Sequence, residues 1–139
     1  MYKIVLDTNI FLSAFVFTGL LPQKIIDLVI EKKLRLCTSA NLEEEVFRKL
    51  SKLKANEEIV ANVNLLLKAS LAYNPQITIT VCRDPKDNFI LELAQTCNAD
   101  YIITRDKDLL ELPRKRWKST KIVKPEGFLS YLRSKKLLK

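Results

Sequence analysis

Acidic residues follow three short apolar runs of this sequence, and a group of glutamates follows a fourth. Such runs are typical of strands buried on both faces of a parallel sheet, whose carboxyl ends meet along one edge. Carboxylates gathered there repel one another, so their charge must be relieved by bound protons or by a cation. The runs are residues 4–6, 34–38, 77–81 and 101–104, and the acids that follow them are Asp7, Glu43, Glu44, Glu45, Asp84, Asp87, Asp106 and Asp108.

Clustered carboxylates favour one kind of chemistry. A hard divalent cation such as Mg²⁺ or Mn²⁺ takes oxygen ligands and needs no histidine. Such a cation activates water and binds a phosphate oxygen, which is the chemistry of phosphodiester hydrolysis. The sequence contains no histidine, which excludes Ser-His-Asp triads, Cys-His pairs and HExxH zinc sites. Any hydrolytic activity must therefore depend on carboxylates, lysine or metal-bound water.

The net charge indicates the kind of binding partner, and the cysteine content indicates the cellular compartment. The 24 Lys and Arg against 16 Asp and Glu give a net charge of +8. This favours an anionic partner, nucleic acid before a membrane surface, although charge that serves only solubility is the alternative. The three widely spaced cysteines form neither a disulfide framework nor a metal-binding pair, so we expect reduced thiols. Without a signal-like or membrane-length apolar segment, the expectation is a cytoplasmic protein with no membrane contact.

The elements that must position the acids alternate between strands and helices. Amphipathic periodicity and capping residues indicate the helices, and short apolar runs indicate the strands. The order predicts one domain over residues 1–139, a three-layer α/β/α architecture with a mostly parallel sheet of four to five strands. The expected helices are 10–17, 22–34, one after Ser39, 56–73, 87–97 and one from Pro125, and the expected strands are 4–6, 34–38, 77–81, 101–104 and 122–123.

Each aspartate also has a purely structural interpretation. Asp87 could cap a helix, and Asp84 with the proline after it is an ordinary turn signal. Asp108 is expected to cap the short turn that begins at Leu109. The placement of the acids at three strand ends and one helix start favours a shared site over these separate roles.

The glutamate triplet leaves a choice open. A helix start usually carries solvated acids, so we expect two of the three to be only that. At about 100° per residue, Glu44 points nearly opposite the apolar stripe of its helix, whereas Glu43 and Glu45 flank that stripe. Spacing does not separate Glu43 from Glu45.

Taken in order, the motifs resemble the PIN-domain family, and look closest to its prokaryotic, VapC-type toxin branch. The resemblance spans the chain from Lys3 to about Leu110. No single motif is specific, but all of them in sequence order are strong evidence. The motifs are Asp7-Thr8-Asn9 after a strand, the Ser39, Glu45 and Leu50 helix, Asp84-Pro85-Lys86-Asp87 before a helix with Ala94, and Tyr101 to Leu110.

The resemblance implies a Rossmann-like fold and a catalytic, metal-binding set of four acids. It selects Glu45, which lies six residues after Ser39 and five before Leu50, as the family pattern has it. The implied cofactor is Mg²⁺ or Mn²⁺, bound as one ion or two. The implied ligands are Asp7, Glu45, Asp87 and Asp106, and the residues expected to support them are Asn9, Asp84 and Thr104.

The function that the resemblance implies is a divalent-metal-dependent endoribonuclease acting on single-stranded or structured RNA. Family members of this type are often toxins silenced by a cognate antitoxin and are usually homodimers. A basic segment with one aromatic residue is the candidate for RNA contact. A solvated loop with its tryptophan in the core is the alternative. The segment comprises Arg114, Lys115, Arg116, Trp117 and Lys118.

Three other functions are weighed against this one. A phosphotransferase of the haloacid-dehalogenase type needs Asp-x-Asp after the first strand, but Asn9 occupies the second position. A receiver-like signalling domain needs a phosphoacceptor aspartate at the end of its middle strand, where this sequence has Cys82 and Arg83. A PIN-type module that binds RNA or a partner without cleavage is the third, and the presence of all four acids argues against it.

Overall fold

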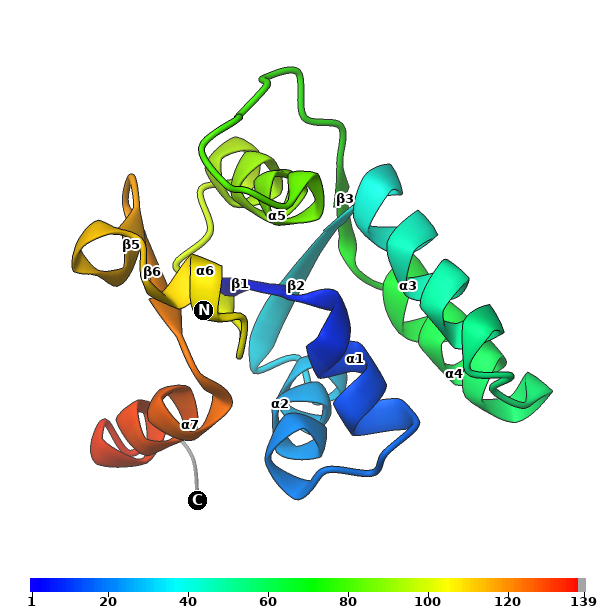
Figure 1. Ribbon diagram of the computed structural model, residues 1–139. Helices are drawn as coiled ribbons and strands as arrows, with labels where there is room; N and C mark the ends of the chain where they lie inside the picture. Colours follow the sequence, from blue (N-terminus) through cyan, green and yellow to red (C-terminus); the bar gives the residue numbers. More distant parts are fainter. Residues whose placement is uncertain (138–139) are drawn as a thin grey trace.

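A twisted sheet runs through the middle of the molecule, with helices on both of its faces (Figure 1). The computed structural model describes residues 1–137, so the last two residues of the predicted domain lie outside it. The elements are β1 (Tyr2–Leu6), α1 (Thr8–Phe15), α2 (Leu20–Ile30), β2 (Leu34–Ser39), α3 (Ala40–Lys52), α4 (Glu57–Lys68), β3 (Leu71–Tyr73), α5 (Pro85–Cys97), β4 (Tyr101–Ile103), α6 (Lys107–Leu110), the 3₁₀ turn η1 (Pro113–Lys115), β5 (Arg116–Trp117), β6 (Thr120–Val123) and α7 (Pro125–Ser134).

The strand order creates a natural place for a site. It is β3-β2-β1-β4-β6-β5, in which all neighbours are parallel except β5 and β6. The chain moves outward from β1 to β3 and then returns to β4 on the other side of β1. Ligands of open parallel sheets bind at such a reversal, outside the carboxyl ends of the strands. Leu6 pairs with Ile103 there, and the Asp7 amide donates to the Ile103 carbonyl over 3.1 Å.

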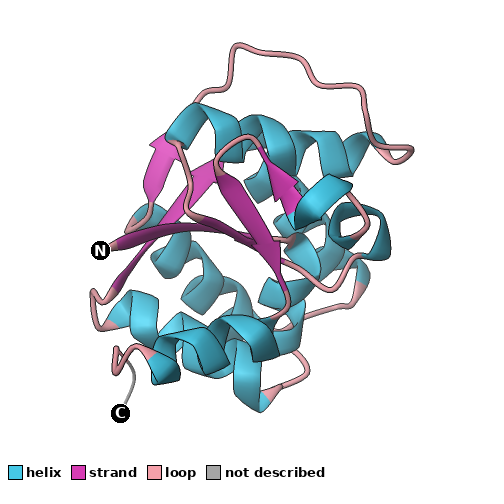
Figure 2. Ribbon diagram, turned by 90° about the vertical axis from the view of Figure 1, so that its left-hand side faces the viewer, coloured by secondary structure: helices cyan, strands magenta, loops and turns pink. Residues whose placement is uncertain are grey.

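The helices form the two outer layers. Helix α5 packs against strands β1 to β4 on one face, and α1, α2 and α7 lie on the other (Figure 2). The apolar runs that predicted β1 and β4 are buried on both faces, as the pattern of a parallel strand requires. The predicted three-layer α/β/α fold with a mostly parallel sheet is therefore confirmed.

The helix predicted over 56–73 is present but shorter, and the prediction of a strand over 77–81 was wrong. Helix α4 ends at Lys68, and the strand that joins β2 is β3, while residues 74–84 are irregular. Ile79 is buried, but Ile77 and Val81 are 38% and 56% exposed. Their β-branched alternation gave the strand signal. The Ile79 amide instead donates to the Glu92 carboxylate over 2.9 Å, so this backbone needs no strand partner.

The sheet has six strands over residues 1–137, one more than the predicted maximum. The additional strand is β5, which lies within the segment predicted to be a basic loop and pairs antiparallel with β6. It has only two residues, too short for a periodic pattern. Within the same residues no single helix has the length and hydropathy to span a membrane, and α1 and α2 meet that test only as a pair bent by 98°.

The contact between Glu92 and Ile79 gives a stability prediction. Replacing Glu92 with Ala leaves the Ile79 amide without its acceptor, which costs about 1–3 kcal/mol. We expect a lower free energy of unfolding in urea and faster proteolysis within residues 74–84. Glu92→Gln retains an acceptor oxygen and serves as the control. Wild-type stability in Glu92→Ala would contradict this role.

Candidate active site

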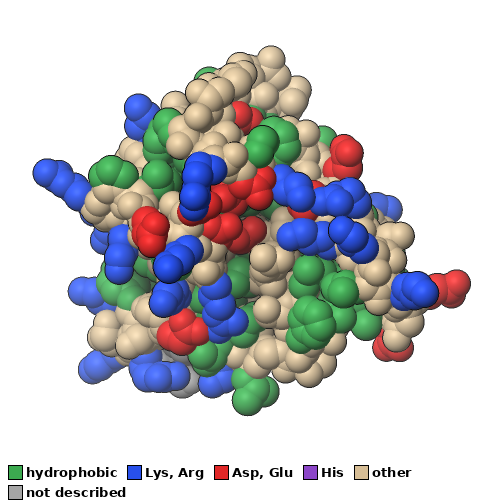
Figure 3. Space-filling view, in the orientation of Figure 1, with side chains coloured by type: hydrophobic (Ala, Val, Ile, Leu, Met, Phe, Trp, Pro, Cys, Tyr) green, Lys and Arg blue, Asp and Glu red, His purple; other side chains and the backbone are tan. Residues whose placement is uncertain are grey.

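The carboxyl ends of β1 and β4 open into a polar cavity of about 110 Å³. Acidic side chains gather in a hollow on the face shown in Figure 3, with Lys and Arg side chains around them. Four different elements or their flanking turns contribute the acids, which the chain separates by as many as 99 positions (106 − 7). All four predicted ligands line this cavity, namely Asp7, Glu45, Asp87 and Asp106.

Asp7 is fixed by the neighbouring strand. It precedes α1 but makes no side-chain capping bond, and it is only 8% exposed. The hydroxyl of the buried Thr104 donates to Asp7 Oδ2 over 2.7 Å, and the Asp106 amide donates to the same hydroxyl oxygen over 2.9 Å. Burial raises the pKa of Asp7; the Thr104 hydrogen bond opposes this, and the charge of Asp106 adds to it. Thr104 thus aligns the acids that follow β1 and β4.

Asp87 holds an oxygen without a partner. It is 5% exposed, and its Oδ2 makes no hydrogen bond, alone among the buried side-chain nitrogens and oxygens of residues 1–137. Burial first, and then the charges of Asp106, Asp7 and Asp84, raise the pKa of Asp87 to about 7. The helix cap is Asp84, whose Oδ1 accepts from the Lys86 amide over 3.0 Å. Asp87 is therefore free to face the cavity.

Asp108 lies close to Asp87 and Asp106, and we call these three residues the acidic cluster. The prediction that Asp108 caps the turn at Leu109 was wrong. The cap is Asp106, whose Oδ1 accepts from the amides of Asp108 and Leu109 over 2.8 and 3.3 Å. One carboxylate oxygen from each of Asp87, Asp106 and Asp108 lies within 4.8 Å of the others. Arg83 donates to Asp108 over 2.6 Å. The sequence signal that Asp108 lies near Asp106 was their spacing of two residues at a helix start.

Glu45 lies at the rim of the cavity and is paired with cations. Arg48 donates to both of its oxygens, and Lys86 and Lys49 lie 3.4 and 3.6 Å from its Oε1. Burial raises the pKa of Glu45, but the Arg48 hydrogen bond and the charge of Lys86 outweigh burial and leave that pKa below its usual value. The neighbouring cations thus favour the ionised form of Glu45, whereas burial raises the pKa of Asp7 and Asp87 and opposes their ionisation.

The structure separates the two glutamates that spacing left equivalent. Glu43 accepts a hydrogen bond from the buried Thr38 hydroxyl over 3.3 Å and does not line the cavity. Glu44 is exposed. Only Glu45 of the three lines the cavity.

The residues predicted to support the ligands all lie at the cavity or against it. Asp84 and Asn9 line it, and Thr104 lies behind Asp7. The Lys49 ammonium donates to Asn9 Oδ1 over 3.1 Å. Lys49 and Lys86 also line the cavity, although neither was predicted to belong to the site. Lys49 follows Glu45 by four residues on one helix, which was a local signal for it, whereas Lys86 reaches Glu45 from another helix.

The basic segment at residues 114–118 does not reach the acids. None of its five residues lines the cavity. Trp117 pairs with Thr120 at the amino end of β6, so it lies toward the opposite edge of the sheet. Its indole donates to Gln95 of α5 over 2.9 Å, and the Lys118 ammonium lies 5.5 Å from the ring centroid. Proximity in sequence to Asp106 did not bring this segment to the site.

Comparison with known proteins identifies the family and agrees with the fold. A sequence model described as "PIN domain" matches residues 3–108. The chain belongs to the PIN-domain family. An uncharacterized protein of Methanocaldococcus jannaschii, MJ1680, is 37% identical over 116 residues, covering 79% of this chain and 74% of that protein. The crystal structure of VapBC2 from Rickettsia felis bound to a promoter DNA fragment contains a similar fold, with a TM-score of 0.62, 16% identity and coverage of 88% of this chain and 98% of that one.

The donor set of this PIN domain fits a divalent cation. Every side chain of the acidic cluster offers oxygen, which Mg²⁺ and Mn²⁺ prefer. Asp87 Oδ2 is buried beside like charges and lacks a hydrogen-bond donor. A divalent cation would relieve both conditions at once, and it would do so without protonating Asp87.

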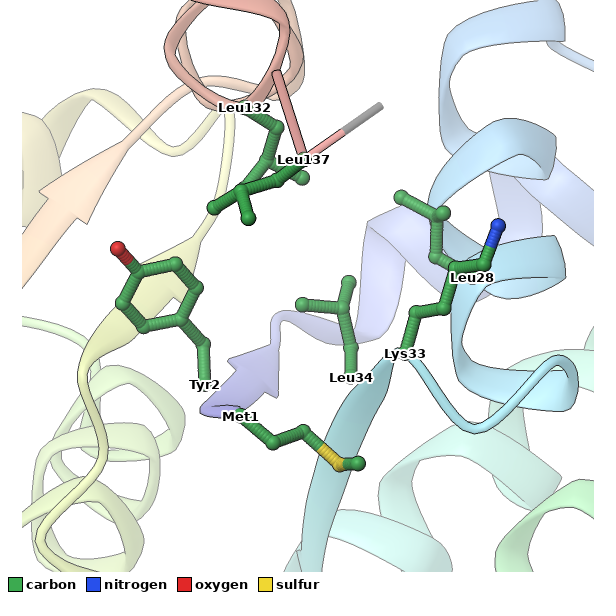
Figure 4. Close-up of a pocket in the computed structure, with 7 residues that line it drawn as sticks. All are labelled: Met1, Tyr2, Leu28, Lys33, Leu34, Leu132 and Leu137. Carbon is green, nitrogen blue, oxygen red and sulfur yellow. The ribbon is translucent and has the colours of Figure 1, made fainter. Parts of the chain in front are cut away.

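A larger cavity of the PIN domain offers no comparable chemistry. It measures about 490 Å³ and lies between the amino ends of β1 and β2 and the ends of α2 and α7 (Figure 4). None of its lining residues is acidic, and one is basic. They are Met1, Tyr2, Leu28, Lys33, Leu34, Leu132 and Leu137.

The charge of Asp87 should destabilise the metal-free PIN domain above neutral pH. Its folded-state pKa of about 7 exceeds the value of about 3.9 in an unfolded chain, so stability falls as the pH rises through this interval. We expect Asp87→Asn to unfold at a higher temperature than wild type at pH 8 in EDTA. The difference should narrow towards pH 5, as followed by circular dichroism.

Asp27→Asn, which changes an exposed acid of α2, is the matched control and should follow the wild type at each pH. Identical profiles for Asp87→Asn and wild type would contradict the strain assigned to Asp87.

Proposed function

We propose that this PIN domain is a divalent-metal-dependent endoribonuclease that hydrolyses phosphodiester bonds of single-stranded or structured RNA. The observation that carries the proposal is the unpaired, buried Oδ2 of Asp87 in a cavity shared with Asp7 and Asp106. A buried carboxylate so placed costs stability in the absence of a cation, and metal-dependent hydrolysis gives the arrangement a purpose.

Different residues at the cavity have different roles in this proposal. Asp7, Asp87 and Asp106 would hold the ion, with Glu45 at the rim. A bound Mg²⁺ or Mn²⁺ supplies a water of lowered pKa and polarises the scissile phosphate. Thr104 holds the Asp7 carboxylate in one orientation, which preorganises the site.

Lysines at the rim support an anionic polymer as substrate. Lys49 and Lys86 line the cavity and their side chains are 29% and 48% exposed, so their ammonium groups would meet phosphate charge there. The net charge of +8 adds long-range attraction for a polyanion. The choice of RNA rests on membership of the PIN-domain family.

We also propose that this chain is the toxin of a toxin–antitoxin pair, active in the cytoplasm as a homodimer and silenced by a cognate antitoxin protein. The fold it shares with a chain of the Rickettsia felis VapBC2 complex supports this setting. We expect this chain to co-purify with the protein encoded by a neighbouring reading frame. The nuclease activity of this chain should be lost when that protein is bound.

Cleavage of single-stranded RNA tests the proposal directly. Purified wild type should cleave in Mn²⁺ and stop in EDTA, and Asp7→Asn should lower the rate on the order of 100-fold or more, because the mutation removes a charged ligand. Product formation on denaturing gels is the measurement. Equal cleavage by wild type and Asp7→Asn would refute the site, and RNA binding without any cleavage would indicate a binding module instead.

Substitutions of Glu45 and Glu43 provide a matched pair of variants that tests which glutamate belongs to the site. Glu45→Gln should lower cleavage by about 10-fold or more, since it removes a charged carboxylate from the cavity. Glu43→Gln should stay within about twofold of wild type, because Glu43 contacts Thr38 outside the cavity. Rates measured at the same Mn²⁺ concentration decide between them, and the reverse order would show that the wrong glutamate is assigned.

A further inference from the structure

A second recess opens beside the acidic cavity. It measures about 300 Å³ and lies between the end of α1, the end of α3 and the start of α5. Lys49 and Lys86 line both hollows, so the two are continuous along the surface. We call this hollow the α1/α3 recess.

The α1/α3 recess carries positive charge without acids. Four of its lining residues are cationic and none is acidic. Arg48, Lys49 and Lys86 are all paired with Glu45 at the border of the acidic cavity. Lys52 is exposed and takes part in none of the ion pairs among residues 1–137. The charge of the recess therefore suits an anionic ligand.

The same recess exposes apolar side chains that a folded domain usually buries. Phe17 is 63% exposed and Leu53 is 45% exposed, whereas Leu12 beside them is 7% exposed. In Figure 3, Lys and Arg side chains over α3 border the acidic cluster, and hydrophobic side chains over α1 lie next to them. An aromatic face beside cations is the combination that binds an unpaired nucleotide, by stacking of its base and attraction of its phosphate.

We propose that the α1/α3 recess binds an unpaired nucleotide of the RNA strand next to the phosphate held in the acidic cavity. The inference rests on the proposed ribonuclease function and names where the substrate strand runs. The strand passes Lys49 and Lys86 and places a base against Phe17, with a phosphate near Lys52. A paired base keeps its faces stacked within a duplex, so the recess selects single strands.

Binding measured in EDTA tests the recess apart from catalysis. The probe is a fluorescein-labelled single-stranded RNA, titrated with wild type, Phe17→Ala or Lys52→Ala and followed by anisotropy. Neither residue lines the acidic cavity. Phe17→Ala should weaken binding about 5- to 100-fold, the effect of one lost stacking contact, and leave the salt dependence unchanged. Lys52→Ala should reduce the slope of log K against log salt by about 0.7.

Matched controls lie outside the recess. Ile30→Ala changes another apolar side chain that is 63% exposed, and Lys121→Ala changes an exposed lysine of β6. Both should bind RNA as the wild type does. Circular dichroism of every variant confirms that the fold is intact. An unlabelled RNA duplex should compete poorly with the probe for wild type, and this preference should shrink in Phe17→Ala.

The outcomes separate the two proposals. If wild type binds and cleaves RNA but Phe17→Ala and Lys52→Ala bind like the controls, the recess assignment is overturned and the ribonuclease proposal stands. If wild type neither binds nor cleaves single-stranded RNA, both fail. If the variants change sedimentation of the protein alone and leave RNA affinity intact, the recess is a protein interface, which overturns the inference.

Discussion

The repulsion among buried carboxylates is the constraint on which this site depends. Asp7, Asp87 and Asp106 reach one cavity from three parts of the chain, and their charges oppose one another. Packing of the sheet and of α5 holds them in place against that repulsion. Thr104 offsets part of it by donating to Asp7. The metal-free domain thus carries strain that a divalent cation would relieve, which joins stability to the proposed chemistry.

Charges of both signs line this cavity. Asp7 and Asp87 are buried near acids of the same sign, and Asp87 lacks a hydrogen-bond donor for one oxygen. Glu45 at the rim is surrounded by Arg48, Lys49 and Lys86, which lower its pKa. The acids would attract a cation and the lysines would attract a phosphate chain, because each meets charge of the opposite sign.

Part of the site could be predicted because its signals are local. The acids at the ends of β1 and β4, and the parallel sheet that gathers them, follow from apolar runs and helix periodicity. Contacts between distant segments left no such signal. Trp117 is close to Asp106 in sequence but is bound to Gln95 of α5, and the run at 77–81 uses Glu92 in place of a strand partner. In both places tertiary contacts overrode the local pattern.

The sequence by itself narrowed the chemistry that is proposed, since it contains no histidine and places acids after buried strands, where oxygen ligands for a metal would gather. It also determined the fold class, because hydrophobic periodicity reports which face of each element is buried. Only the tertiary structure decided that Glu45 and not Glu43 lines the cavity, that Asp106 caps α6 while Asp108 joins the cluster, and that lysines form the rim. These choices depend on side-chain directions and hydrogen bonds across elements, which spacing along the chain does not specify.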